Sequence, residues 1–345
     1  MSAEEIYRSL KAKLGDVVPD FELHAKAEVA SKVLRLKAAS NAVILAHNYM
    51  EPALFHSVPD FTGDSLDLSR KAAATDKDVI VFCGVRFMAE TAKILNPSKT
   101  VLLPAERAGC SLASSITAAD IRALRSRFPG VPVVAYVNTY AEVKAEVDIC
   151  CTSSNANAVV DSLESETVIF VPDEYLARNV ARETGKHIVF PSLTDPSDEA
   201  DTDLDVQMIG WKGRCEVHEK FELADITNVR RQFPDVLILA HPECSPEVVE
   251  AADFSGGTNA MIRYVERSDA PRYLLLTECS MGDNIAAANR GKEMLRLCSV
   301  RCPHMNEITL EDTLESLRLT RHRIEVPEEI RVRAERSLRR MIAIG

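Results

Sequence analysis

Three cysteines in three different parts of the chain are the residues best suited to hold a metal. Cys110, Cys215 and Cys302 occur in the contexts Ala-Gly-Cys-Ser, Gly-Arg-Cys-Glu and Arg-Cys-Pro-His, which predict loops. Each follows the third predicted strand of one of three similar stretches, so packing these stretches about a pseudo-threefold axis would bring the thiols together. Three thiolates without a fourth suit an iron–sulfur cluster with one open iron, or a three-thiolate zinc site. For any one of the nine cysteines, a small buried hydrophobe is the alternative.

A second set of reactive side chains stands at the end of the first apolar run in each stretch. His47 ends Val-Ile-Leu-Ala-His, Tyr136 ends Val-Val-Ala-Tyr, and His241 ends Leu-Ile-Leu-Ala-His. Ligands of parallel α/β sheets bind beyond the carboxyl ends of the strands, so these rings are predicted to face a pocket. Glu243 is the carboxylate near His241 and is the candidate for general acid–base chemistry. Tyr49 offers a phenol near His47. The alternative for each ring alone is a structural hydrogen bond.

Small hydroxyl residues form the third set. Ser65, Ser153 and Thr258 follow the three rings at nearly equal distances, and each precedes a helical pattern. N-capping explains such a residue at any single site. Three of them at matched positions favour anion binding at helix N-termini, so the sequence predicts a shared anion pocket.

The elements that must position these groups alternate along the chain. From residue 42, short Val/Ile/Leu runs alternate with helical stretches, and unbroken apolar runs indicate strands buried on both faces. The sequence therefore predicts an α/β fold of three similar α/β/α modules with short parallel sheets about a pseudo-threefold axis. The expected divisions are N-terminal helices 1–41, modules 42–125, 126–220 and 221–308, and C-terminal helices 309–345. The expected strands are 43–47, 79–82, 101–103, 133–136, 168–171, 187–190, 237–241, 273–276 and 297–300. The expected helices include 2–14, 24–38, 87–95, 174–183 and 282–289, with two more beginning at Thr309 and Pro327.

Composition excludes several classes of protein. A net charge of −11 argues against nucleic acid or an anionic membrane as the main partner. The N-terminus is unlike a signal peptide and no apolar run approaches the length of a membrane span, so we expect a cytoplasmic protein. The sequence has no P-loop, GxGxxG or GxSxG motif, which counts against nucleotide hydrolases, nicotinamide dehydrogenases and α/β-hydrolases. The acidic segment 194–207 is typical of a surface loop.

Nine segments together resemble the quinolinate synthases, the iron–sulfur enzymes of NAD biosynthesis. They are AHNYMEP (46–52), GDSLDLS (63–69), FCGVRFMAETAKIL (82–95), PAERAGCSLA (104–113), AYVNTYAEVK (135–144), TSSNA (152–156), GRCEVHEKF (213–221), AHPEC (240–244) and CPHM (302–305). The resemblance implies three α/β/α modules around a [4Fe-4S] cluster held by Cys110, Cys215 and Cys302. It also implies condensation of iminoaspartate with dihydroxyacetone phosphate to give quinolinate, phosphate and water. The iminoaspartate would come from an aspartate oxidase or dehydrogenase.

The resemblance also assigns the site residues. It implies a substrate pocket formed by His47, Ser65, Tyr136, Asn138, Ser153, His241, Pro242, Glu243 and Thr258. It implies catalytic positions at Glu243, His47, Tyr49, His241 and His218. Gly257 departs from a serine that is common in the family, and Asn306 from a frequent lysine. Two alternatives stay open from the residues themselves: an open-iron hydro-lyase acting on a hydroxy acid, and a non-enzymatic iron–sulfur redox protein.

Overall fold

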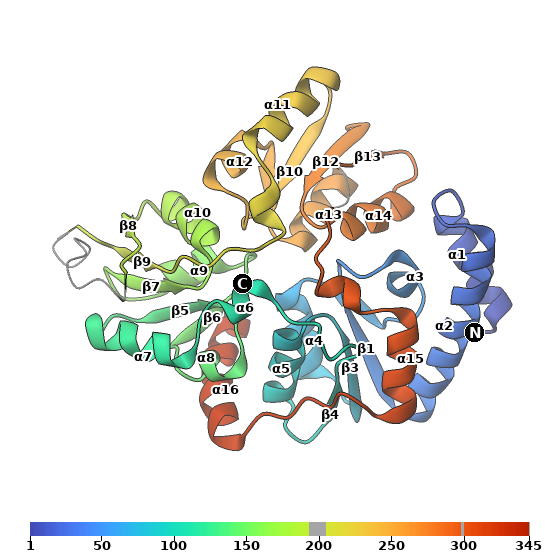
Figure 1. The fold of residues 1–345 in the computed structure, drawn as a ribbon, viewed down its shortest axis with the longest axis horizontal. Coiled ribbons are helices and arrows are strands. Elements are labelled where there is room, and N and C mark those ends of the chain that lie inside the picture. Colours follow the sequence, from blue (N-terminus) through green and yellow to red (C-terminus); the bar gives the residue numbers. More distant parts are fainter. Residues whose placement is uncertain (193–204, 298–299, 345) are drawn as a thin grey trace.

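The computed structural model describes residues 1–192, 205–297 and 300–344, whose strands form three separate parallel sheets grouped around one centre (Figure 1). The strands of the first and third sheets are β1 (Ala42–His47), β2 (Phe61–Gly63), β3 (Val79–Cys83), β4 (Thr100–Leu102), β10 (Leu237–Ala240), β11 (Phe254–Ser255), β12 (Arg272–Leu276) and β13 (Glu293–Leu295). The first sheet has the order β2-β1-β3-β4 and the third has β11-β10-β12-β13. The two sheets therefore share one topology, and the predicted α/β class with three similar modules is confirmed.

The second sheet contains an extra strand. Its strands are β5 (Val133–Tyr136), β6 (Ile149–Cys151), β7 (Val168–Val171), β8 (Ile188–Val189) and β9 (Met208–Gly210). Their order is β6-β5-β7-β9-β8, so β9 lies where β4 and β13 lie in the other sheets. The strand predicted at 187–190 is present as β8, but it is the edge strand of the sheet and pairs with β9. The sequence analysis missed β9 because three residues after an acidic segment give too short an apolar signal.

Two further differences concern short strands. The last strand of the third sheet is β13, not 297–300, of which 298–299 lie outside the described residues. The side chains of β13 are exposed or only half-buried, so its apolar pattern is weaker than that of the loop after it. The strands β2, β6 and β11 were not predicted, because two or three residues are too few to show a period. The acidic segment 194–207 lies outside the described residues as far as 204.

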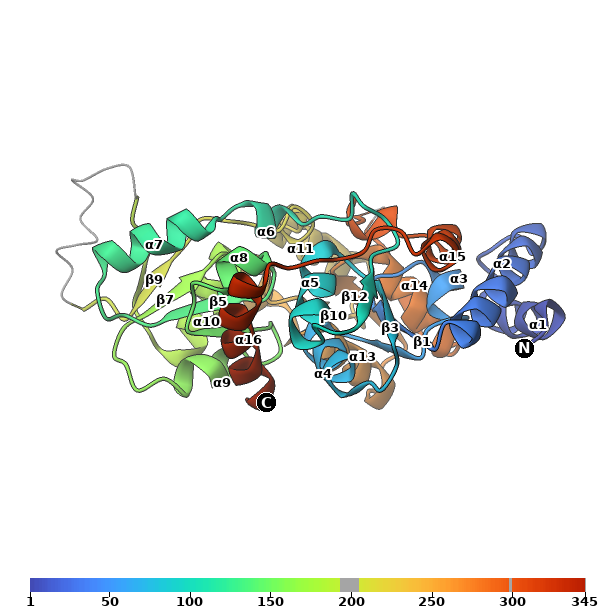
Figure 2. The same ribbon diagram turned by 90° about the horizontal axis from the view of Figure 1, so that it is seen from below.

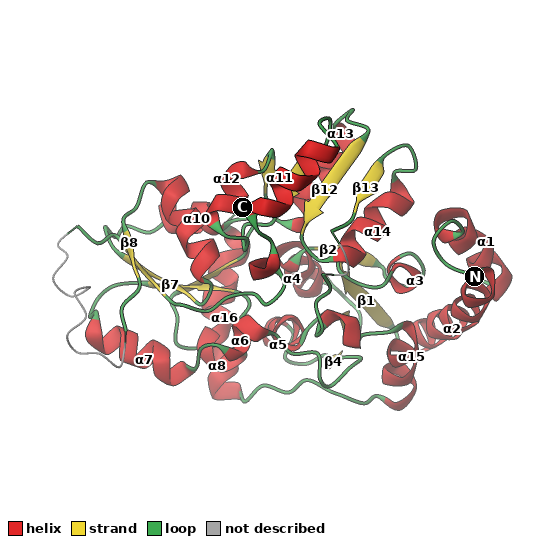
Figure 3. Ribbon diagram, turned by 45° about the horizontal axis from the view of Figure 1, so that its top comes forward, coloured by secondary structure: helices red, strands yellow, loops and turns green. Residues whose placement is uncertain are grey.

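Helices flank the sheets (Figure 3). In the first and second parts of the chain they are α3 (Pro52–Phe55), α4 (Ser65–Ala74), α5 (Arg86–Leu95), α6 (Ser111–Ser114), α7 (Ala118–Arg127), α8 (Ala141–Lys144), α9 (Ala156–Asp161) and α10 (Glu174–Thr184). In the third part they are α11 (Leu223–Gln232), α12 (Pro246–Ala251), α13 (Thr258–Arg267) and α14 (Cys279–Ala288). Two 3₁₀ turns, η2 (His218–Lys220) and η3 (Met305–Glu307), complete the loops.

The terminal helices are α1 (Ala3–Leu14), α2 (Asp20–Ala39), α15 (Leu310–Leu319) and α16 (Glu328–Ala343). Of the terminal helices, α2 and α15 pack on the first sheet, α16 packs on the second, and α1 packs on α2. Ser2 and Glu5 form a capping box at α1, and the side chain of Thr309 caps α15. The C-terminal helix α16 packs against α8, β6 and α5, between the first two sheets (Figure 2). Its predicted apolar face is buried from Ala334 to Met341.

The hydrophobic core is divided unequally. One cluster of buried side chains runs through the first two sheets and the terminal helices, whereas the third sheet packs with two smaller clusters of its own. All six residues of β1 are buried, as expected for a strand covered on both faces. No helix in the described parts of the chain is long and apolar enough to cross a membrane.

Candidate active site

A cavity lies between the three sheets, and side chains from all three line it. The predicted site residues on its wall are His47, Tyr49, Ser65, Cys110, Tyr136, Asn138, Ser153, Cys215, His218, His241, Glu243, Thr258 and Cys302. Pro242 is not on this wall; its carbonyl accepts a hydrogen bond from Asn179 Nδ2 at 2.9 Å. The described residues lining the cavity include no lysine or arginine. An anion held here must therefore rely on neutral donors, helix N-termini or a metal.

The three cysteines occupy the same local structure in three loops. Each follows the strand of its sheet that comes last in the chain, which is β4, β9 or β13, and precedes one turn of helix. In each turn the amide four residues after the cysteine donates to the cysteine carbonyl at 3.0 Å. Two further backbone N–H groups donate to each sulfur: those of Leu112 and Ala113 to Cys110, of Val217 and His218 to Cys215, and of His304 and Met305 to Cys302. Such N–H···S contacts favour the thiolate form, which is the form that binds metal.

The charges around the sulfurs fit a metal centre. Burial raises the pKa of Cys110 to about 12 and that of Cys302 to about 11, and it raises the pKa of Cys215 well above its usual value. Cys302 adds to the rise in the Cys110 pKa, and Cys110 adds to that of Cys215, so the three thiols lie close enough to interact electrostatically. The thiols therefore keep their protons without metal, and a bound metal would replace those protons. Three soft donors from three loops suit iron–sulfur or zinc chemistry.

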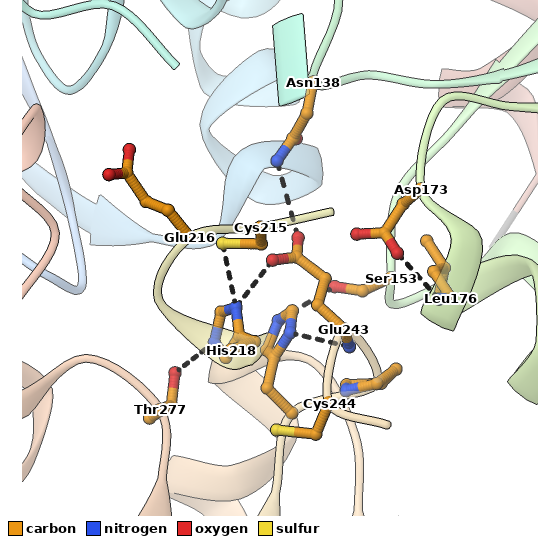
Figure 4. A network of polar contacts seen from close by, with 12 residues as sticks. Asn138, Ser153, Asp173, Leu176, Cys215, Glu216, His218, Glu243, Cys244 and Thr277 are labelled. Atoms are coloured by element: carbon orange, nitrogen blue, oxygen red, sulfur yellow. Dashed lines mark hydrogen bonds and ion pairs between the residues drawn. The ribbon is translucent and has the colours of Figure 1, made fainter. Parts of the chain in front are cut away.

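One other group in the cavity has the composition of a metal site. Ligand atoms of Cys215, His218 and Glu243 lie within 4.8 Å of one another. However, His218 Nδ1 is 2.7 Å from Glu243 Oε2, and its Nε2 is 3.0 Å from Thr277 Oγ1 (Figure 4). Both ring nitrogens already have protein partners. A hydrogen-bond network therefore accounts for this cluster without an ion.

The network extends from Glu243 to Tyr49. Because a carboxylate can only accept, His218 donates from Nδ1 to Glu243. The Thr277 hydroxyl lies 3.0 Å from His218 Nε2 and 2.6 Å from the Tyr49 hydroxyl. Tyr49, Thr277, His218 and Glu243 thus form one continuous chain of hydrogen bonds. Sequence analysis missed Thr277, although it directly follows β12 and so obeys the rule that site residues lie at strand ends.

Glu243 is held as an anion by several donors. The Tyr136 hydroxyl donates to its Oε1, and Asn138 Nδ2 lies 3.5 Å from the same oxygen. Burial alone would raise the pKa of Glu243, but the neighbouring histidines and the bonds from His218 and Tyr136 outweigh it and lower that pKa. Burial and the charge of Glu243 raise the pKa of Tyr136 well above its usual value. Tyr136 therefore remains a donor while Glu243 remains ionised.

The two strand-end histidines share one arrangement. The Nδ1 atom of His47 accepts from the backbone N–H of Tyr49 at 3.2 Å, and His241 Nδ1 accepts from that of Glu243 at 3.3 Å. Burial lowers the pKa of His47 to about 4 and that of His241 to about 3, so both rings are uncharged at neutral pH. An uncharged ring that accepts at Nδ1 carries its proton on Nε2. Each ring is therefore a neutral Nε2–H donor, and His241 Nε2 lies 3.4 Å from Ser153 Oγ.

The three hydroxyl residues do not cap the helices that follow them. Asp64 caps α4, Asn155 occupies the N-cap position of α9, and Gly257 occupies that of α13. Ser65 and Thr258 are the first residues of α4 and α13, and Ser153 lies in the turn before α9. Since capping does not explain them, their position on the cavity wall favours contact with a ligand.

Gly257 and Asn306, the two positions that differ from the family pattern, have different structural surroundings. A Cβ atom at Gly257 would come too close to the Ser154 hydroxyl, which donates to Asp64 Oδ2 at 3.0 Å. Ser154 thus fills the space in which a serine at 257 would stand. Asn306 is exposed, and its backbone N–H makes the same contact to the cysteine carbonyl as in the other two loops.

Three parallel α/β units around a cavity lined by three thiols, four imidazoles and three carboxyl groups define a three-module α/β protein with a candidate metal centre. The chain belongs to the quinolinate synthetase A family, whose sequence profile matches residues 31–343. It is 54% identical over 328 residues to quinolinate synthase 2 of Mesorhizobium japonicum, with 95% of each chain covered. It is 50% identical over 333 residues to the quinolinate synthase of Sinorhizobium fredii, covering 96% of this chain and 87% of the relative. It is 52% identical over 312 residues to that of Xylella fastidiosa, covering 90% of this chain and 86% of the relative.

Proposed function

We propose that this protein is a quinolinate synthase that condenses iminoaspartate with dihydroxyacetone phosphate and releases quinolinate, phosphate and water. The observation that carries the proposal is the threefold repetition of one cysteine turn around one cavity. Each sulfur comes from a different sheet and receives two backbone N–H groups. Membership of the quinolinate synthetase A family supports the same activity. The iminoaspartate would come from an aspartate oxidase or dehydrogenase, the class of enzyme that makes an imine from an amino acid.

The cofactor proposed for the three thiols is a [4Fe-4S] cluster. Cys110, Cys215 and Cys302 would each bind one iron as thiolate, which leaves the fourth iron without a protein ligand. Such an iron is a Lewis acid that binds a substrate oxygen and helps water to leave. The N–H groups at each sulfur would stabilise the thiolates.

Neutral donors would bind the anionic groups of the substrates. His47 and His241 each offer an Nε2–H, and Ser65, Ser153 and Thr258 offer hydroxyls. The N-terminus of α13 adds backbone N–H groups that no helical carbonyl can satisfy. Asp64 stands at the N-terminus of α4, so a phosphate or carboxylate is better placed at α13.

The chain of hydrogen bonds from Tyr49 to Glu243 would move protons. Glu243 is the ionised group and is suited to accept a proton from a substrate carbon or nitrogen. Burial raises the pKa of Tyr49 well above its usual value, so the phenol is suited to donate. Thr277 and His218 connect the two, so a proton taken up at one end can be balanced at the other.

Anaerobic purification followed by iron and sulfide counts and a quinolinate assay tests the proposal. We expect C110A to lose the visible absorbance of the cluster and the formation of quinolinate. The matched control is C83A, since Cys83 is buried away from the cavity beside Thr313. A C110A protein that keeps both properties would refute the ligand assignment. Turnover of a hydroxy acid without triose phosphate would favour a hydro-lyase. A cluster spectrum that does not change when dicarboxylates are added would favour a redox protein.

A further inference from the structure

Asp173 is a buried carboxyl group directly behind the cavity wall. It follows β7 and caps α10, where its Oδ1 accepts from the backbone N–H of Leu176 at 2.9 Å. The side chain is 0% exposed, and its Oδ2 has no hydrogen-bond partner among the described residues. Figure 4 shows the carboxyl group of Asp173 beside that of Glu243. The Asp173 oxygen that does not cap α10 is turned towards the Glu243 carboxylate. A buried oxygen without a partner needs an explanation.

Glu243 has room for one more donor. A carboxylate offers about four acceptor positions. Tyr136 and Asn138 use positions on Oε1, and His218 uses one on Oε2. A proton on Asp173 Oδ2 is the donor that the remaining position lacks. Hydrogen bonds in such sites are often long without substrate and tighten when substrate binds.

The surroundings of Asp173 favour its neutral form. The titratable groups that act on it or that it acts on are Glu243, Glu174, Tyr136 and Cys244, and none is a cation. Glu174 turns away to pair with Arg178 and Arg214. Burial, followed by the charge of Glu243, raises the pKa of Asp173 well above its usual value, whereas that of Glu243 is lowered. When the pKa values of two neighbouring carboxyl groups are shifted in opposite directions, one group usually acts as an acid and the other as a base.

We propose that Asp173 is a neutral carboxylic acid whose Oδ2–H donates to Glu243 and so positions the base of the reaction. This inference rests on the proposed function, since it takes Glu243 as the proton acceptor. Asp173 does not line the cavity, so it acts through Glu243 and not on the substrate. A donor from this side holds the Glu243 carboxylate in one orientation without adding a second negative charge.

Two substitutions separate this role from helix capping. Serine at 173 keeps an N-cap for α10 but is too short to reach Glu243. Asparagine keeps the cap through Oδ1 and places an Nδ2–H where the Oδ2–H stands. We expect D173S to lower kcat by about tenfold or more, since about one hydrogen bond to a charged group is lost, with little change in KM. We expect D173N to restore most of that loss. Equal kcat values for D173S and wild type, or for D173S and D173N, would overturn the proposal.

An infrared difference spectrum tests the protonation state without using turnover. A protonated carboxyl group absorbs apart from ionised carboxylates, and its band shifts in heavy water. We expect the wild-type holoenzyme at neutral pH to show this band, D173N to lack it and E243Q to keep it. A wild-type spectrum without the band would overturn the proposal even if D173S failed to fold. An inactive E243Q beside a fully active D173S would reject the role of Asp173 alone. A fully active E243Q would reject the proposed role of Glu243 together with it.

Discussion

Substituting Thr277 by valine tests the chain of hydrogen bonds that joins Tyr49 to Glu243. Valine has nearly the shape of threonine but no hydroxyl, so the change removes one polar atom from a site that is 1% exposed. The hydroxyl stands 2.6 Å from Tyr49 Oη and 3.0 Å from His218 Nε2. His218 is buried and Tyr49 is half-buried, and T277V leaves each without that contact.

The expected size of the effect follows from these two contacts. A buried polar group left without a partner costs about 1–3 kcal/mol. His218 stays anchored to Glu243 through Nδ1, so one ring nitrogen and one phenol are affected. Each 1.4 kcal/mol corresponds to about a tenfold change in rate. We therefore expect T277V to lower kcat by roughly tenfold to a hundredfold.

The assay is anaerobic quinolinate formation, with the iron content of every preparation measured in parallel. Among the described residues, the Thr277 hydroxyl contacts Tyr49 and His218 and none of the three cysteines, so the iron content of T277V should match that of wild type. The control is T277S, which keeps the hydroxyl and should retain a kcat within about threefold of wild type. A T277V enzyme with full iron content and a wild-type kcat would refute the proton route.

Two further predictions concern acid and the Gly257 position. Burial lowers the pKa of His47 to about 4 and of His241 to about 3, so below pH 6.5 the unfolded chain binds protons that the folded chain does not. Stability should therefore fall as the pH drops from about 6.5 towards 4, by roughly 3 kcal/mol for His47 alone. H47Q should flatten the pH dependence of the denaturant midpoint, and an unchanged curve would contradict this. G257S should raise the KM for dihydroxyacetone phosphate, because the new side chain displaces the Ser154 hydroxyl. Adding S154A removes that oxygen and leaves the Ser153 hydroxyl, at 3.2 Å, as the nearest atom to the new Cβ, so the double variant should recover much of the loss.

The internal repetition of the sequence was enough to predict the three sheets and all their inner strands except β9. Unbroken apolar runs such as β1 and β10 have a strong signal, because both faces of the strand are buried. Edge strands such as β2 and β11 have too few residues to show one. In the second sheet β9 lies between β7 and β8. Which strands pair with β9 depends on tertiary packing and not on the local pattern of apolar residues.

The residues that the sequence analysis missed in the site follow a rule that it applied only in part. The predicted residues His47, Tyr136 and His241 lie at the end of the first apolar run of each module. Thr277 directly follows β12 of the third sheet, and Asp173 lies two residues beyond β7 of the second sheet. The carboxyl ends of neighbouring parallel strands share one edge of a sheet, so the same search at β7 and β12 would have found both residues.

The hydrophobic core is divided between the first two sheets and the third, and the three cysteines come from both sides of this division. The first two sheets share one hydrophobic cluster with the terminal helices, but the third sheet packs with clusters of its own. Glu243 and Thr277 come from the third sheet, whereas His218 precedes it and Tyr49 follows β1. The chain of hydrogen bonds therefore crosses the boundary between the two parts of the core. Cys302 follows β13 of the third sheet and the other two cysteines follow β4 and β9, so a metal bound by all three fixes the same boundary. Binding of the proposed metal and alignment of the proposed proton route would therefore be coupled, because both depend on how the third sheet packs against the first two.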